Sequence, residues 1–136
     1  MTKKSLFLGL LLIMSPLFSP TVFAEEDAAP RMGYFTLAPD LTTNFVTKGK
    51  KLGYIQVRVD ILVADNRELP NLEHHNPQIR NALVEVLGQQ PEQRIKSLAG
   101  REEIRKECLT AINEVLLTET GKTLALDLLF TKYIYQ

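Results

Sequence analysis

The stretch YIQVRVDILVAD, residues 54–65, constrains the fold more than any other part of the chain. Apolar and polar side chains alternate along it, and a β-strand sends successive side chains to opposite faces. The pattern therefore predicts a long strand over residues 52–64, with one buried face and one largely polar face, as is typical of an antiparallel sheet. The apolar positions are Ile55, Val57, Val59, Ile61 and Val63.

Three further segments favour extended structure. Residues 34–37 begin with two aromatic side chains and predict a short strand. Residues 41–47 predict a second one, which the turn KGKK at 48–51 joins to the long strand as a hairpin. In the C-terminal stretch TLALDLLFTKYIYQ, leucines alternate with other residues and predict a last strand. We expect this strand to lie beside the long one, in the interior of the sheet.

The spacing of apolar residues becomes helical after the long strand. Asn76 and Pro77 predict the start of a helix, with Asn76 as the N-cap and the proline in the first turn, and Gly88 predicts its end. Pro91 predicts the start of a short second helix, which buries Ile95 and Leu98.

A third helix is predicted between Gly100 and Gly121. Its apolar stripe consists of Ile104, Cys108, Ile112, Val115 and Leu116, and Glu102 is spaced for a helical ion pair with Lys106. The order β-β-β-α-α-α-β groups strands and helices instead of alternating them. The predicted class is therefore α+β, an antiparallel or mixed sheet with three helices on one face.

The N-terminal segment differs from the rest of the chain. Lys3 and Lys4 precede an apolar run over residues 6–14, and the segment closes on Val-Phe-Ala at 22–24 before an acidic stretch. This pattern predicts a secretory signal peptide over residues 1–24, and an uncleaved membrane anchor is the alternative. Residues 25–32 then form a linker, and residues 33–136 form one domain.

The two histidines, His74 and His75, are the first candidates for chemistry. They lie just ahead of the predicted helix start, and neither has a second histidine or a cysteine at the spacing of zinc ligands. We interpret them as a solvated lead-in to the helix. A zinc site, the alternative, needs ligands from distant parts of the chain.

Other reactive residues give equally little support for catalysis. Ser97 has no neighbouring histidine, and Cys108, the single cysteine, lies on an apolar stripe and is expected to be a buried free thiol; a disulfide to another chain is the alternative. Asn113 either hydrogen-bonds to a loop or is exposed. We therefore predict no catalytic, cofactor-binding or metal-binding residue, no cofactor and no enzymatic activity. The 16 basic and 16 acidic residues give no basic face for nucleic acid.

The order of several motifs resembles that of the FliL family of flagellar basal body-associated proteins. The matching stretches are YFTLAPDLTTNFV, LGYIQVRVDILV, NPQIRNALVEVLG, GREEIRKECLTAIN and the terminal LLFTKYIYQ. Within them, Asn44, the Pro-x-Ile-Arg start at 77–80, Ile104-Arg105, Ile112-Asn113 and the final Gln136 are similar to the family pattern. The resemblance covers roughly residues 33–136.

This resemblance implies a non-enzymatic periplasmic domain of stomatin/prohibitin type at the inner membrane and flagellar basal body. It also implies homo-oligomeric rings around the stator proteins MotA and MotB, which support stator engagement and torque in swimming and swarming. Typical members carry a cytoplasmic tail and a transmembrane helix, whereas this chain begins with a segment like a cleavable signal. A soluble periplasmic binding module of the same fold, outside the motor, is therefore the alternative hypothesis.

The signal-peptide interpretation makes a direct prediction. The protein recovered from cells should begin at Glu25, because the Val-Phe-Ala triplet suits a signal peptidase. Intact-mass measurement of the periplasmic and membrane fractions tests this. A full-length chain in the membrane fraction would restore the anchored topology.

Overall fold

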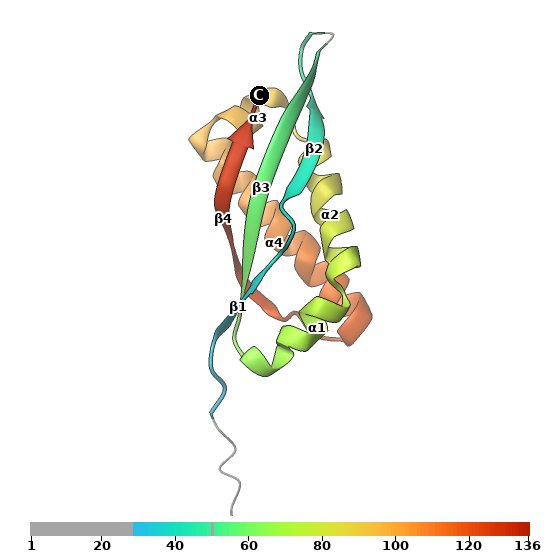
Figure 1. Ribbon diagram of the computed structural model, residues 1–136, viewed down its shortest axis with the longest axis vertical. Coiled ribbons are helices and arrows are strands. Elements are labelled where there is room, and N and C mark those ends of the chain that lie inside the picture. Colours follow the sequence, from blue (N-terminus) through green and yellow to red (C-terminus); the bar gives the residue numbers. More distant parts are fainter. Residues whose placement is uncertain (1–28, 50) are drawn as a thin grey trace, which may run out of the picture.

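The computed structural model describes residues 29–49 and 51–136, and within them the chain forms two layers (Figure 1). One layer is a four-stranded antiparallel sheet, and the helices lie against one of its faces. The predicted signal segment, the first half of the predicted linker and Lys50 lie outside the described residues. The elements are β1 (Gly33–Thr36), β2 (Leu41–Val46), β3 (Leu52–Val63), a short 3-10 helix (Asn66–Glu68), α1 (Leu69–His74), α2 (Asn76–Gly88), α3 (Glu92–Lys96), α4 (Leu98–Thr120) and β4 (Ala125–Tyr135).

Strand β3 is the centre of the sheet. β4 pairs with its residues 55–63, β2 with 52–57 and β1 with 60–63, all antiparallel. Because one edge of a strand accepts one partner at each position, β1 and β2 follow each other along the edge opposite β4. The predicted hairpin is confirmed by the β2–β3 register. The expected interior position of the last strand is wrong: β4 is an edge strand, and β3 takes the interior.

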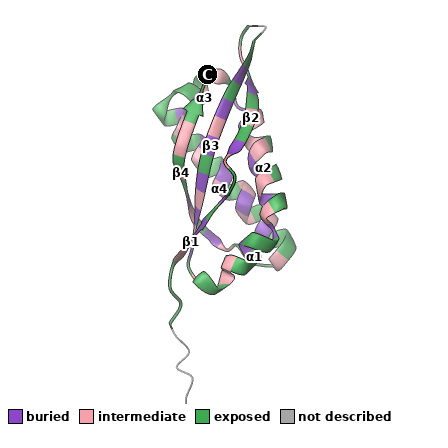
Figure 2. Cartoon of the chain, viewed as in Figure 1, coloured by how far each residue is buried: buried purple, intermediate pink, exposed green. Residues whose placement is uncertain are grey.

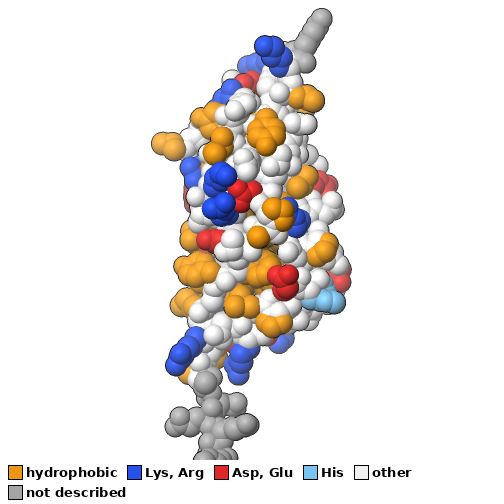
Figure 3. Space-filling view, viewed as in Figure 1, with side chains coloured by type: hydrophobic (Ala, Val, Ile, Leu, Met, Phe, Trp, Pro, Cys, Tyr) orange, Lys and Arg blue, Asp and Glu red, His pale blue; other side chains and the backbone are white. Residues whose placement is uncertain are grey.

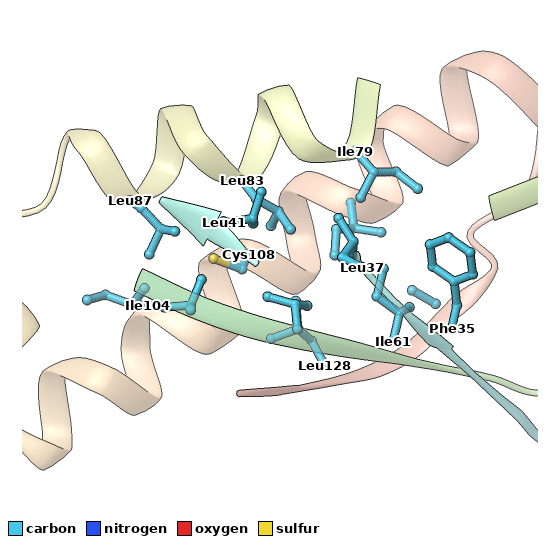
Figure 4. Packing of buried hydrophobic residues seen from close by; sticks show 14 of the residues in the cluster. Phe35, Leu37, Leu41, Ile61, Ile79, Leu83, Leu87, Ile104, Cys108 and Leu128 are labelled. Carbon is cyan, nitrogen blue, oxygen red and sulfur yellow. The ribbon is translucent and has the colours of Figure 1, made fainter. Parts of the chain in front are cut away.

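The alternating residues of β3 build the core, as their pattern predicts. All five apolar positions from Ile55 to Val63 are at most 1% exposed, and Figure 2 shows buried and more exposed positions alternating along the strand. Side chains from α2 and α4 point toward these positions from the other layer (Figure 4). They include Ile79, Leu83, Leu87, Ile104, Cys108, Ile112 and Leu116.

The start of α4 differs from its prediction. The helix begins at Leu98, which is 86% exposed and not buried as expected, and it continues through Gly100. The Ser97 hydroxyl caps it by accepting from the Gly100 N–H at 3.0 Å. A Cβ at residue 100 would lie 2.1 Å from the carbonyl oxygen of Arg94, so glycine is needed here for close packing of α3 on α4. At the other end, Gly121 stops the helix with φ of 77°, as expected.

Strand β4 does not keep the strict alternation that its leucines predict. Its register against β3 shifts between Leu62 and Val63, and as a result Ala125 is buried while Leu126 is 51% exposed. The amide of Asn113 fixes this end of the strand, since it donates to the Ala125 carbonyl at 2.9 Å and accepts from the Ala125 N–H at 3.0 Å. Asn113 therefore forms hydrogen bonds as one alternative expected, but its partner is the first residue of β4 and not a loop.

The α+β class with an antiparallel sheet is confirmed, but the predicted order lacks one element. α1 is a two-turn helix with Pro70 in its first turn and a fully buried Leu72, so four helices, not three, occupy the described residues. None of the helices in residues 29–49 and 51–136 is both long enough and apolar enough to cross a membrane.

The two faces of β3 give a stability prediction. Val59→Asp buries an unpaired charge in the core and should cost several kcal/mol, comparable to the whole stability of a small domain. Leu52→Asp, on the same strand but 70% exposed, is the matched control and should change stability little. Urea unfolding of both variants measures the difference. Equal losses would contradict the assignment of the two faces.

Candidate interaction surface

The histidines lie where two helices meet, and only His74 is exposed, as a solvated lead-in predicts. His74 ends α1, and His75 connects it to α2 with only 9% of its surface exposed. The expectation of solvation is therefore wrong for His75. Its Nδ1 lies 4.0 Å from Glu119 Oε2 and has no hydrogen bond to any described residue. Asn76 is the first residue of α2 and not its N-cap, and its Oδ1 is also buried without a partner there.

The remaining candidates have structural roles. Cys108 is fully buried, and burial raises the pKa of its thiol to about 12, which keeps it protonated. Glu102 pairs with Arg105 at 2.6 Å instead of the expected Lys106. In the part of the chain that the structure describes, no group of three or more histidine, cysteine or acidic side chains is placed to hold a metal ion.

The face of the sheet away from the helices is the candidate interaction surface, and we refer to it as the open face. It carries the side chains that alternate with the core positions, together with their partners on the neighbouring strands. Figure 3 shows this open face, with basic and acidic side chains near its centre and hydrophobic ones around them. No other element of the described residues packs over it (Figure 1).

A charged cluster joins three segments at the centre of the open face. Asp40, just before β2, accepts hydrogen bonds from Arg58 Nε on β3 at 2.8 Å and from Lys132 Nζ on β4 at 3.0 Å. Gln56 Nε2 donates to the same carboxylate at 3.2 Å. The hydrogen bond from Arg58, followed by that from Lys132, lowers the pKa of Asp40 below its ordinary value. The cluster therefore holds its side chains in a fixed arrangement across the sheet.

Exposed apolar side chains flank this cluster on both sides. Toward the β2–β3 turn they are Val46, Leu52, Tyr54 and Ile134, and toward the opposite end they are Tyr34 and Leu129. Rigid apolar groups around a polar centre suit contact with another protein surface, whereas catalysis requires a converging set of reactive groups.

The sequence predicts the part of this surface that lies on β3, but not the residues that meet it from β2 and β4. The alternation in β3 predicts the polar positions Gln56, Arg58 and Asp60. Pro39-Asp40, in contrast, is typical of a turn, and Lys132 lies 92 residues away from Asp40 in the sequence. Nothing local in the sequence indicates that these charges meet.

Comparison with known proteins identifies the family. A family model described as flagellar basal body-associated protein FliL matches residues 34–136, from β1 to the last residue. The chain belongs to the FliL family. It is also similar to the flagellar protein FliL of Aquifex aeolicus (strain VF5), with 26% identity over 114 residues that cover 83% of this chain and 68% of that relative. This FliL-family chain is thus a flagellar basal body-associated protein, from a structural family not known for enzymatic activity.

The Asp40 cluster gives this FliL-family chain a pH-dependent contribution to stability. Because folding lowers the pKa of Asp40, the contribution is complete above the ordinary aspartate value of 3.8 and is lost as the pH falls below it. Asp40→Asn keeps the shape but removes the charge, so its unfolding free energy should fall less steeply at acid pH. Urea titrations from neutral pH to below 3.8 test this. Parallel curves for the two proteins would contradict it.

Proposed function

We propose that this chain is a non-enzymatic part of the flagellar motor that supports the engagement of the stator proteins MotA and MotB, and so torque in swimming and swarming. The observation that carries the proposal is the family match over residues 34–136, which covers every described strand and helix apart from Gly33, the first residue of β1. We place the protein in the periplasm, associated with the inner membrane at the basal body.

The geometry supports a role in binding and positioning. The open face presents apolar side chains around an ion cluster that β2, β3 and β4 hold together. Such a surface can maintain contact with a partner without chemical change in either protein. It would leave the helical side of the domain free for contacts between copies.

Ring formation is the second part of the proposal. A ring repeats one head-to-tail contact between neighbouring copies, and such a contact closes only when the rotation between copies divides a full turn evenly. A ring of this kind around the stator would hold the stator more firmly under load. Filament export uses other machinery and would continue without it.

Deletion of the gene should therefore weaken motility without preventing filament assembly. We expect a larger loss of swimming speed in viscous medium than in dilute medium, because the proposed role matters most under load. The measurement compares deletion, complemented and wild-type strains with matched growth rates, and filaments are counted by microscopy. Unchanged motility, with no cross-linking of the protein to itself or to stator proteins, would favour the soluble periplasmic binding module.

Two complementing variants then separate the open face from the rest of the surface. Ile134→Asp places a charge on the open face at a residue that is 45% exposed, and Lys106→Asp introduces the same acidic side chain at an exposed residue of α4. Both should fold normally, since neither side chain belongs to the core. If the open face takes part, only Ile134→Asp should reduce motility in viscous medium.

A further inference from the structure

A shallow groove between α2 and α4 lies on the helical layer, away from the open face. Ala82 and Val115 contribute its apolar lining, and Glu85, Glu114 and Glu119 contribute carboxylates. No lysine or arginine of the described residues lines it. The groove is therefore negatively charged with an apolar base.

The carboxylates of this groove differ from most others in the protein. Among the described residues, acidic side chains elsewhere commonly pair with a base, as Asp40 does with Arg58, Glu92 with Lys96 and Glu107 with Arg94. Glu85 and Glu114 have no such pair within that part of the chain, and Glu119 has only His75. The groove thus holds negative charge that the described residues leave unneutralised.

A second feature lies behind this groove, next to its Glu119. His75 is 9% exposed, and its Nδ1 faces Glu119 Oε2 at 4.0 Å without a hydrogen bond to any described residue. The Oδ1 of Asn76, in the first turn of α2, lacks a partner in the same way. Buried polar atoms without partners are uncommon and costly. A group with several N–H donors and a positive charge would pair with the exposed carboxylates of the groove, and a lysine ammonium has three such donors.

The chain itself presents such groups at its opposite end. The turn between β2 and β3 carries Lys48 and Lys51, and this end of the two strands lies opposite α1 along the long axis (Figure 1). Lys48 and Lys51 are exposed, and neither forms an ion pair with a described residue. The groove lies on the first turns of α2 and the last turns of α4, toward the other end of the long axis.

We propose that Lys48 and Lys51, beside the β2–β3 turn of one copy, dock into the α2–α4 groove of the next copy, on Glu85, Glu114 and Glu119. This contact rests on the self-association proposed above and assigns it to named residues. It is heterologous, because the turn and the groove are different surfaces, and it can therefore be repeated from copy to copy. A second copy is the favoured occupant because the same chain carries both complementary surfaces too far apart to meet within one molecule.

A charge-swap experiment tests the contact. One full-length variant carries Lys48→Glu and Lys51→Glu, so that its turn and its groove are both acidic. The other carries Glu85→Lys and Glu114→Lys, so that its groove and its turn are both basic. Each alone should self-associate about tenfold or more weakly than the wild type, because like charges across an interface are strongly unfavourable. An equal mixture of the two variants should associate again, because the acidic turn of one variant can dock into the basic groove of the other, and the basic turn of the second into the acidic groove of the first.

Sedimentation velocity and chemical cross-linking provide the readout, and thermal melting confirms that each variant folds. Lys106→Glu is the matched control, an exposed lysine on α4 without an ion pair among the described residues. It should associate like the wild type. Raising the salt concentration should also weaken the wild-type contact, since the screening length falls from about 10 Å at 0.1 M to about 3 Å at 1 M.

Engineered disulfides provide a second, independent measurement. A chain with both Lys48→Cys and Glu114→Cys should form disulfide-linked dimers and larger oligomers under mild oxidation. Each single variant should not, because the proposed contact brings the turn of one copy to the groove of the next and never joins two identical positions. The native Cys108 can stay in place, since it is buried and its thiol remains protonated.

The outcomes separate this contact from the proposed function. Unchanged self-association of both charge variants would overturn the turn-and-groove contact while ring formation still stands. A wild-type protein that is monomeric in solution and in cells would overturn both. If the groove variant loses binding to another basic protein while self-association is unchanged, the second copy is the wrong occupant.

Discussion

The structure depends on the two-faced pattern of strand β3. Each of the other three strands pairs with it, and its apolar side chains from Ile55 to Val63 form the centre of the core. The same strand directs Gln56 and Arg58 to the open face, where they contact Asp40. A slip by one residue would exchange the two faces and bury the charges. Stability and surface chemistry are therefore fixed by one register.

Helix α4 protects the edge that this arrangement leaves on β4. The Leu37 N–H donates to the Val59 carbonyl, so Val59 and every second residue of β3 direct their N–H and C=O groups away from β4. The β4 residues opposite them direct their own N–H and C=O groups away from β3, toward the free edge of the sheet. Three side chains of α4 meet these outward groups: Asn113 at Ala125, Arg105 at Leu128 and Arg101 at Phe130. An open edge can recruit foreign strands, and the helix thus closes part of this one with its own donors.

Regular periodicity made most of the fold predictable, and contacts between distant residues did not follow from it. The alternation in β3 and the helical spacing around Ile79 and Ile104 were sufficient for the class and for the core. The two turns of α1 are too short to show a clear helical period. Gly100 indicates a break between two helices in the sequence, but it lies inside α4, where the nearby Arg94 carbonyl leaves no space for a side chain. The Asp40 cluster and the groove each combine elements far apart in the chain, so no local pattern indicates them.

Balanced charge makes local arrangement decisive for assembly. The chain has a formal net charge of zero, so no overall repulsion keeps identical copies apart, and local charges decide how they meet. Exposed ion pairs contribute at most about 1 kcal/mol each, and a contact made mainly of lysines and glutamates is weak between free molecules. Confinement of many copies around one stator, as in the proposed ring, raises their effective concentration and makes a weak contact sufficient. Weak contacts would also allow individual copies of the proposed ring to exchange.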